Sequence, residues 1–306
     1  IMSGELDDIE ITSILIGLKM KTESIEEIIG AAKVMREKSL KIKSPINTID
    51  TCGTGGDMKD TLNISTSAAI VAASAGVKIA KHGNRSVSSK SGSADMLEKL
   101  GYRISSNIDE LEKQLIKKNF CFLFAQHHHS AMKNVINVRK KLSTRTIFNL
   151  LGPLTNPANA KKQLLGVYSK DLVSIHCKCL KELGSDKALV VHGLDGLDEI
   201  SLSEKTLINE LKDNKILEFI FDPSDYGYDL INIEEIKGGD PSYNADCFIK
   251  MINGEYKSFQ KIVEINAGVA IYLSNITDNL KDGFEVARKA IDHGKTRNFV
   301  NLIINE

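Results

Sequence analysis

The sequence has no net charge, few cysteines and no long apolar run. Its 306 residues include 40 Lys and Arg against 40 Asp and Glu, so the formal net charge is zero. This balance argues against a general nucleic-acid binder and against a polybasic membrane-surface protein, because both depend on an excess of basic residues. The longest apolar run, at residues 68–80, is interrupted by Ser74, Gly76 and Lys78. It falls short of the roughly 18 apolar residues expected of a membrane-spanning helix.

The five cysteines are scattered along the chain, at Cys52, Cys121, Cys177, Cys179 and Cys247. A small, odd number of scattered cysteines does not indicate a disulfide scaffold, so we expect reduced thiols and a cytoplasmic location. With 42% hydrophobic and 26% charged residues, the composition is typical of a globular enzyme with a sizeable core. A length of 306 residues predicts about two domains.

Two regions of the chain differ in their hydrophobic pattern. Residues 9–38 repeat apolar side chains at helical spacing, and the polar stretch 41–45 then resembles a linker. We therefore expect a small all-helical domain over residues 1–44, joined by helices from around residues 130–160. Over residues 46–306, short apolar runs alternate with helical patterns, which predicts an α/β domain with a mostly parallel central sheet flanked by helices. The expected strands are residues 48–52, 77–81, 121–125, 164–169 and 187–192, followed by a hairpin of 206–211 and 216–221.

A glycine-rich segment follows the first expected strand. Three glycines lie within residues 50–57, where the backbone can bend sharply and point its N–H groups at an anion. Such turns also occur for packing reasons, and this one matches neither the P-loop nor the dinucleotide-binding pattern. Residues 63–66 then open a helix, where Ser65 or Thr66 either caps the helix or accompanies a phosphate bound at its N-terminus. Together these features favour phosphate binding.

A second polar segment follows the next expected strand. Residues 81–93 contain three cations, five serines and two glycines. A solvated loop is the simplest alternative, although such loops are seldom built between two buried elements. Lys and Arg supply positive charge, while serine hydroxyls and backbone N–H groups donate hydrogen bonds to phosphoryl oxygens. Because parallel strands end at one edge of a sheet, the two segments predict a crevice for a polyphosphorylated ligand.

An acidic pair, Asp198 and Glu199, follows the fifth expected strand. In isolation such a pair is most often a solvated turn. Here it follows a strand in a chain with two phosphate-type segments. Carboxylate ligands for Mg²⁺ are then the better interpretation, since Mg²⁺ shares its coordination with phosphate oxygens.

Two further polar features have simpler explanations. The consecutive histidines at residues 127–129 do not suit zinc, because neighbouring residues cannot converge on one ion in a helix or a strand. Arg139, on the helix that follows, is either a surface residue or a bidentate clamp for a carboxylate. Neither feature identifies a function by itself.

Six segments, taken in order, resemble the anthranilate phosphoribosyltransferase family: GTGGD, NIST, KHGNRSVSSKSGS, HHSAMK with an arginine after five more residues, RTIFNLLGPLTNP and HGLDGLDEIS. The resemblance extends from about Met2 to near the C-terminus. It implies an enzyme of tryptophan synthesis that joins anthranilate to phosphoribosyl pyrophosphate (PRPP). It also implies Mg²⁺, with two ions per monomer, and a homodimer formed through the helical domain. A missing segment before Ile1 is expected as well.

The resemblance assigns roles to individual positions. Metal ligands are expected at Ser65, Asp198 and Glu199. Anthranilate contacts are expected at Gly53, Asn84 and Arg139, and His82 is a wall of that pocket. The positions expected to contact PRPP are Gly53, Gly56, Asp57, Thr61, Asn63, Ile64, Ser65, Thr66, Lys81, His82, Gly83, Asn84, Arg85, Ser86, Val87, Ser88, Ser89 and Ser93. We expect no covalent nucleophile and no dedicated general base.

Three positions depart from the family. Gln126, Ser130 and Asn137 stand where family members often carry proline. Because they flank the aromatic-substrate region, we expect them to affect loop stiffness and substrate affinity more than the type of reaction. Two alternatives remain: a pyrimidine-nucleoside phosphorylase-like enzyme, and a non-catalytic nucleic-acid-binding relative of the same fold. Zero net charge weighs against the second.

Overall fold

The computed structural model describes residues 1–45, 47–86 and 90–304. Its first two helices are α1 (Asp8–Lys21) and α2 (Ile25–Lys38), which confirms the helices expected over residues 9–38. Asp7 and Ser24 begin them with capping boxes, in which each side chain accepts a hydrogen bond from an N–H of the first turn. Local sequence therefore determines where these helices start.

A seven-stranded sheet lies at the centre of the larger part of the chain, in the order β3-β2-β1-β4-β5-β6-β7. The strands are β1 (Ile49–Gly53), β2 (Ile79–Gly83), β3 (Phe120–Phe124), β4 (Lys162–Gly166), β5 (Lys187–Gly193), β6 (Thr206–Lys212) and β7 (Lys215–Phe221). Strands β1 to β5 pair in parallel, whereas β6 and β7 form an antiparallel hairpin at one edge. Every expected strand is confirmed to within three residues at either end.

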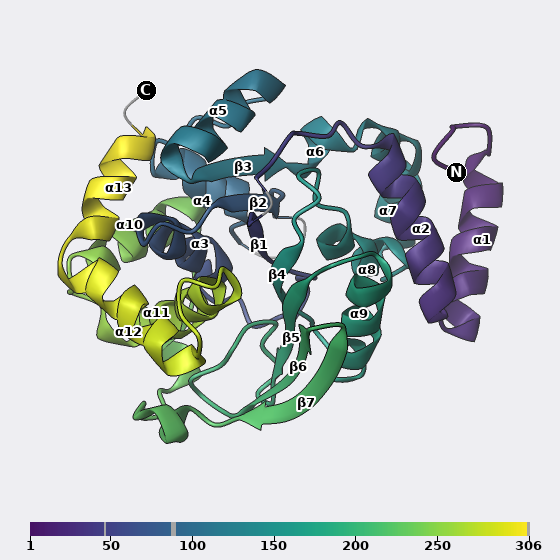
Figure 1. Cartoon of the computed structure of the whole chain (residues 1–306). Coiled ribbons are helices and arrows are strands. Elements are labelled where there is room, and N and C mark those ends of the chain that lie inside the picture. The colour runs from purple at the N-terminus through teal and green to yellow at the C-terminus, as the bar shows by residue number, and fades with distance from the viewer. Residues whose placement is uncertain (46, 87–89, 305–306) are drawn as a thin grey trace.

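Helices cover both faces of the sheet (Figure 1). One face carries α3 (Ile64–Ser74), α4 (Ser93–Lys99), α10 (Pro241–Ile252), α11 (Lys257–Leu273), α12 (Leu280–Asp292) and α13 (Lys295–Ile304). The other face carries α1, α2, α5 (Ile108–Lys118), α7 (Lys133–Leu142), α8 (Phe148–Leu151) and α9 (Asp171–Glu182). Neighbouring residues of a strand join different cores, as Leu164 and Leu165 of β4 do, because strand side chains alternate between faces.

Helix α11 lies inside the first of these layers, and almost all of its 17 residues are buried. It packs against α3 and α12. Two glycines let α11 and α12 approach closely: a Cβ on Gly268 would lie 2.5 Å from the Phe284 ring, and one on Gly283 would lie 2.4 Å from the Gly268 carbonyl oxygen. The position of α11 is therefore tightly constrained, and this helix contacts the loop after β5.

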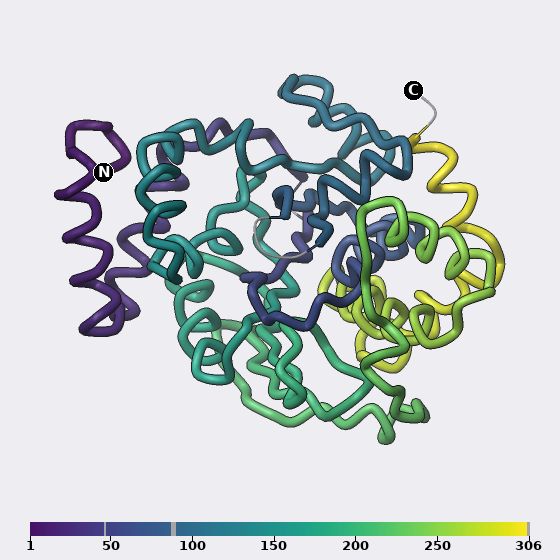
Figure 2. The backbone as a smooth tube through the Cα atoms, turned by 180° about the vertical axis from the view of Figure 1, so that it is seen from behind, coloured from purple at the N-terminus to yellow at the C-terminus, as the bar shows by residue number. Residues whose placement is uncertain are grey.

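The N-terminal helices pack directly against the larger domain. α1 contacts α7, and α2 contacts α8 and α9. Apolar residues of all these helices share one core with strands β4 and β5. Seen from behind, in Figure 2, the N-terminal helices and α13 lie at opposite ends of the molecule. Among the described residues, no helix combines the length and the apolar character that crossing a bilayer requires.

Candidate active site

The loops after β1, β2 and β5 meet at one edge of the sheet. The last residues of these strands are Gly53, Gly83 and Gly193. All three strands belong to the parallel part of the sheet, so their carboxyl ends point to the same edge. The glycine-rich segment, the serine-rich segment and the acidic pair therefore come together, as expected for a crevice that binds a phosphorylated ligand.

The acidic pair connects the glycine-rich segment to helix α3. Asp198 accepts a hydrogen bond from the Gly55 N–H at 2.8 Å, and Glu199 accepts one from the Ser65 N–H at 3.0 Å. A Cβ on Gly53 would lie 2.6 Å from the Asp198 carboxylate, so a side chain at this position would displace that carboxylate. The two carboxylates are packed parts of the site, and the interpretation as a solvated acidic turn is wrong.

Helix α3 begins with a carboxylate from another segment in place of its own cap. Within the described residues, Asn63 makes no capping bond with its side chain, and the helix begins at Ile64. Ser65 and Thr66 lie inside the first turn, so the alternative in which one of them caps the helix is wrong. Glu199 occupies the capping position, where the positive end of the helix dipole stabilises negative charge.

Burial and like charge raise the pKa of both carboxyl groups. The pKa of Asp198 rises because the group is buried and because the Asp57 carboxylate lies nearby. The pKa of Glu199 rises through burial and through the charge of Asp198, while Lys81 opposes this effect. The carboxylates thus outnumber the one ammonium beside them, and hard oxygen ligands with excess negative charge suit a divalent cation.

Lys81 lies within β2 and not in the loop after it. Its side chain is only 1% exposed, and its ammonium donates to the Thr51 carbonyl at 2.5 Å and to the Ser65 hydroxyl at 3.4 Å. Burial lowers the pKa of Lys81, although Asp50 and the acidic pair act in the opposite direction. The expectation that Lys81 lies in the cationic loop is therefore corrected: it lies in β2 and hydrogen-bonds to Ser65, and its contact with PRPP stays a prediction.

His82 is also buried in β2. Its backbone N–H donates to Asp50 at 3.0 Å, and its ring lies 5.2 Å from the ring of His129. Burial and the neighbouring histidines lower the pKa of His82 well below its ordinary value, so the ring is neutral near pH 7. A neutral ring suits the expected role as a pocket wall.

Asp95 ties the two ends of the serine-rich segment together. Its carboxylate accepts hydrogen bonds from the N–H groups of Ser86 at 3.0 Å and Gly92 at 2.9 Å, and from the Arg85 guanidinium at 3.0 Å. A Cβ on Gly92 would lie 2.3 Å from the Ser86 nitrogen, so the two ends meet only with glycine there. The expected PRPP contacts Val87, Ser88 and Ser89 lie outside the described residues.

Side-chain hydrogen bonds join this segment to helix α3. The Thr66 hydroxyl donates to Ser93 at 3.0 Å, and the Asn63 amide donates to the Ser91 carbonyl at 3.1 Å. Asn63 also accepts a hydrogen bond from Asn244 of α10 at 2.8 Å. The structure therefore brings these expected positions together.

Two other expected positions, Ile64 and Thr61, differ in burial: Ile64 is buried and Thr61 is half-buried. Ile64 is 1% exposed and packs in the core, so only its backbone can meet a ligand. Thr61 forms an isolated β-bridge with Lys237. Among the expected PRPP contacts, Ile64, Thr66, Lys81 and His82 are buried, whereas Thr61, Asn63 and Ser65 are half-buried.

Arg139 lies on α7, beside the N-terminal helices. Its guanidinium carbon is 5.6 Å from the centre of the Phe148 ring, and burial lowers its pKa. The residue is half-buried, and its role as a carboxylate clamp stays a prediction. Asn84 accepts a hydrogen bond from Gln126 at 3.4 Å, so one of the three departures from the family contacts an expected anthranilate position directly.

Other residues that shape the site were not expected from the sequence. Arg145 donates to the Gly56 carbonyl oxygen and stacks on the Tyr168 ring at 3.8 Å, so it fixes the glycine-rich segment. Asn266 of α11 binds the backbone beside Glu199. A polar residue inside an apolar helix is the signal that could have identified Asn266, because buried polar groups need partners.

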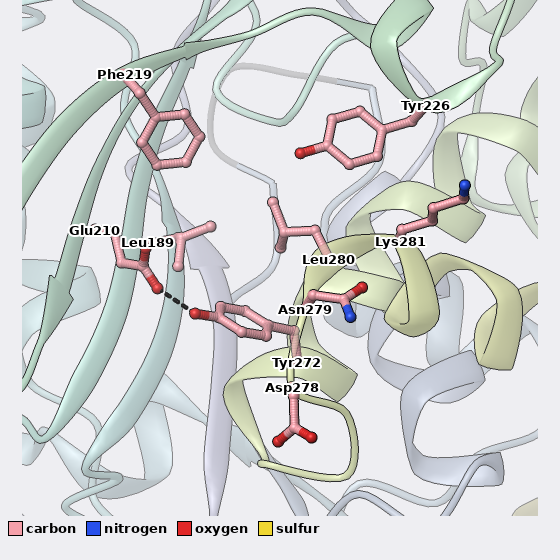
Figure 3. A pocket seen from close by; sticks show the side chains of 9 residues that line it. All are labelled: Leu189, Glu210, Phe219, Tyr226, Tyr272, Asp278, Asn279, Leu280 and Lys281. Atoms are coloured by element: carbon pink, nitrogen blue, oxygen red, sulfur yellow. Dashed lines mark hydrogen bonds between the residues drawn. The ribbon is translucent and has the colours of Figure 1, made fainter.

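A cavity of about 300 Å³ lies elsewhere, between the β6–β7 hairpin and the α11–α12 connection (Figure 3). Phe219, Tyr226 and Leu280 line it, and Tyr272 donates to Glu210 at 2.6 Å on one wall. The carbonyl oxygen of Tyr272 accepts a hydrogen bond from Lys187, at the start of β5. The cavity is therefore near the amino ends of the parallel strands, away from the crevice.

The chain is similar to glycosyl transferases over nearly its whole length. Residues 1–39 match the helical bundle domain of the glycosyl transferase family, and residues 46–297 match its α/β domain. The chain is 48% identical to the anthranilate phosphoribosyltransferase of Thermoanaerobacter sp. (strain X514), over 96% of this chain and 87% of that protein. It is 45% identical to that of Methanobrevibacter smithii, over 97% of this chain and 89% of that protein.

Solved structures agree with the sequence relatives. The anthranilate phosphoribosyltransferase of Thermus thermophilus superposes with a TM-score of 0.94 at 36% identity, over 99% of this chain and 91% of that chain. The enzyme of Saccharomyces cerevisiae in complex with PRPP and Mg superposes with a TM-score of 0.88 at 31% identity, over 97% of this chain and 85% of that chain. The chain therefore belongs to the anthranilate phosphoribosyltransferases of this glycosyl transferase family.

Proposed function

We propose that the protein transfers the 5-phosphoribosyl group of PRPP to the amine of anthranilate and releases pyrophosphate, as a step of tryptophan biosynthesis. The observation that carries this proposal is the contact of Asp198 with the Gly55 N–H and of Glu199 with the Ser65 N–H. It joins an acidic pair, a glycine-rich segment and a helix N-terminus at one edge of the sheet. These groups together suit a pyrophosphate bound with a divalent cation.

Magnesium fits the acidic pair chemically. Ser65, Asp198 and Glu199 supply hard oxygen atoms, and the burial and neighbouring negative charge that raise the pKa of both carboxyl groups favour a bound cation. When bound, Mg²⁺ neutralises charge on the departing pyrophosphate. We propose two ions per monomer, since Asp198 and Glu199 hydrogen-bond to different segments. The yeast relative solved with PRPP and Mg supports the choice of metal.

PRPP would lie against the N–H groups of the glycine-rich segment, the start of α3 and the ends of the serine-rich segment. Hydrogen bonds there join Thr66 to Ser93, Asn63 to the Ser91 carbonyl, and Ser65 to Lys81. The anthranilate pocket would include Gly53, Asn84 and Arg139, with His82 as a wall. The yeast enzyme was also solved with 4-fluoroanthranilate, at a TM-score of 0.87 to this chain, which supports an aromatic carboxylate as the acceptor.

The reaction needs little acid–base chemistry. An aromatic amine is already neutral near pH 7, so it attacks without prior deprotonation by a strong base. A C–N bond forms at the anomeric carbon as its bond to pyrophosphate oxygen breaks, and the amine proton passes to solvent. The protein's task is to align the two substrates and to stabilise the leaving charge with N–H donors. No covalent intermediate is involved.

The helical domain has further proposed roles. We place the domain boundary between residues 44 and 46, with α7 and α8 completing the helical bundle, because α1 contacts α7 and α2 contacts α8. A homodimer through this domain is supported by apolar side chains on α1 that face solvent, such as Ile9 at 76% and Met20 at 78% exposure. A cytoplasmic location fits five buried free cysteines.

A fluorescence assay tests the proposed function. Anthranilate fluorescence should disappear when PRPP and Mg²⁺ are both present, and should persist when either is omitted. Thymidine and uridine with phosphate serve as competing substrates, and phosphorolysis of either without anthranilate turnover would indicate a nucleoside phosphorylase instead. A salt-dependent shift of single-stranded DNA without turnover would indicate the nucleic-acid-binding alternative.

A further inference from the structure

Asn266 is a fully buried amide in the apolar helix α11. Its carbonyl oxygen accepts a hydrogen bond from the Ile200 N–H at 3.1 Å, and its amide nitrogen donates to the Ile200 carbonyl at 3.0 Å. The same nitrogen also donates to the Ile262 carbonyl, one turn earlier, at 2.9 Å. A single side chain therefore pairs with both backbone groups of Ile200, as a neighbouring strand would.

Ile200 immediately follows the acidic pair and is itself fully buried. It lies in the loop between β5 and β6, where no strand partner serves its backbone among the described residues. Without Asn266 the N–H and carbonyl groups of Ile200 would be buried and unpaired, which is unfavourable for polar backbone groups. The amide thus fixes the backbone one residue away from Glu199.

The other side of the pair is held by close packing. A Cβ on Gly166, at the end of β4, would lie 1.5 Å from the Asp198 carbonyl oxygen, so the backbones of β4 and the loop are in direct contact. The pair therefore lies between two fixed points, Gly166 and Ile200. Helix α11 also packs against α3, whose Ser65 N–H binds Glu199. Both partners of the Glu199–Ser65 contact thus depend on α11.

We propose that Asn266 is a positioning residue for the metal-binding pair. By holding Ile200 it sets the orientation of Asp198 and Glu199 toward Mg²⁺ and the pyrophosphate of PRPP, although it contacts neither. This inference rests on the proposed function, because it concerns the same site. Asn266 lies more than 60 positions further along the chain than the acidic pair. It supplies no ligand atom, yet the metal site would require it.

The test compares Asn266→Leu with Gln260→Leu. Gln260 is a buried amide of the same helix, and it hydrogen-bonds to Asp292 at 2.8 Å. Both substitutions exchange a buried amide for an apolar side chain, and only the first removes contacts to the acidic loop. Asn266→Ala is the second variant, because its smaller side chain leaves room for water and introduces no new apolar branch into the core.

Hydrogen exchange gives a readout that is independent of activity. The peptide containing Ile200 should exchange slowly in the parent protein and in Gln260→Leu, and at least about tenfold faster in both Asn266 variants. Mn²⁺ binding in the presence of PRPP, followed by loss of the free-ion electron paramagnetic resonance signal, should weaken about tenfold or more in the Asn266 variants. Their KM for PRPP should rise, while the KM for anthranilate should change by less than about threefold.

Several outcomes would overturn the proposal. Unchanged exchange at Ile200 or unchanged Mn²⁺ binding in folded Asn266→Leu would do so, and so would equal losses in Gln260→Leu. If neither Asn266 variant folds, Asn266 is a folding residue and the positioning role is rejected. Failure of the proposed function is distinguishable, because the parent protein itself would then bind no Mn²⁺ with PRPP and leave anthranilate fluorescence unchanged.

Discussion

Arg85 is paired with Glu98 through two hydrogen bonds, of 2.6 Å and 2.7 Å, from the two ends of its guanidinium. Asp95 accepts a third bond from the same group at 3.0 Å. These carboxylates raise the pKa of Arg85. An arginine expected to contact PRPP is thus occupied by acidic side chains, and it remains 44% exposed. Because exposed ion pairs contribute little to stability, a phosphate can compete for this guanidinium.

Removing the Glu98 charge should strengthen PRPP binding. In Glu98→Gln, Arg85 keeps its Asp95 bond and loses its bidentate partner, so we expect the KM for PRPP to fall by up to about fivefold, since exposed pairs contribute about 0–1 kcal/mol. Initial rates at varied PRPP provide the measurement. Glu285→Gln is the matched control, because Glu285 pairs with Lys289 at 2.6 Å on a different helix. A rise in KM would mean that Glu98 orients Arg85 for the substrate.

Removing the Asp95 charge should have the opposite effect. Asp95→Asn replaces one acceptor oxygen by an NH2 donor, which must face either the N–H groups of Ser86 and Gly92 or the Arg85 guanidinium, so the contacts that hold the segment together should weaken. We expect a rise of about tenfold or more in the KM for PRPP and a loss of about 1 kcal/mol in unfolding free energy, typical of the net contribution of a hydrogen bond between partly buried groups. Kinetics and urea unfolding measure the two effects. Asp109→Asn, at an exposed helix start, should change neither.

The strands and the order of the site loops could be predicted because their signals are local. The strands beginning at Thr206 and Lys187 start where expected, since short segments rich in apolar residues with turn residues between them identify strands. The prediction was less accurate where tertiary contacts decide. The sequence places Lys81 in the cationic loop around the phosphates. In the structure β2 extends to Gly83, so Lys81 lies within the strand and its side chain is buried.

Contacts between distant segments could not be predicted from one sequence. Ser65 and Thr66 are residue types that commonly cap helices. Only the tertiary fold shows that Glu199 accepts the N–H hydrogen bond at the start of α3 instead. Likewise, Asn266 is 66 residues from Ile200, and nothing in the local pattern of either residue indicates the pairing. The acidic pair was recognised from its position after a strand. The contacts that hold the acidic pair in place depend on packing, so the sequence carries no local signal for them.

Acidification should destabilise the protein through His129. Burial lowers the pKa of His129 from its ordinary 6.5 to about 4, so between these values the unfolded chain binds a proton that the folded protein does not. The contribution of His129 to the free energy of unfolding is therefore fully present above about pH 6.5. As the pH falls, the free energy of unfolding decreases through this group, by about 2 kcal/mol at pH 5. Thermal unfolding at pH 7 and pH 5 should show a smaller decrease for His129→Gln than for the parent. The exposed His293→Gln should behave as the parent does, and equal decreases in all three proteins would contradict the role of His129.

Truncation of Arg139 should weaken anthranilate binding and spare PRPP. The half-buried guanidinium beside Phe148 is the proposed partner of the anthranilate carboxylate, and a bidentate pair of this kind is stronger than a neutral hydrogen bond. In Arg139→Ala we expect the KM for anthranilate to rise by about 10- to 100-fold, with the KM for PRPP changed by less than about threefold. Calorimetric titration of anthranilate in the presence of PRPP measures the affinity directly. Arg139→Lys keeps the charge without the planar fork, so it should lie between the parent and Arg139→Ala. Full anthranilate affinity in Arg139→Ala would show that Arg139 does not bind anthranilate. Gly53 and Asn84 would then be the remaining proposed contacts of anthranilate.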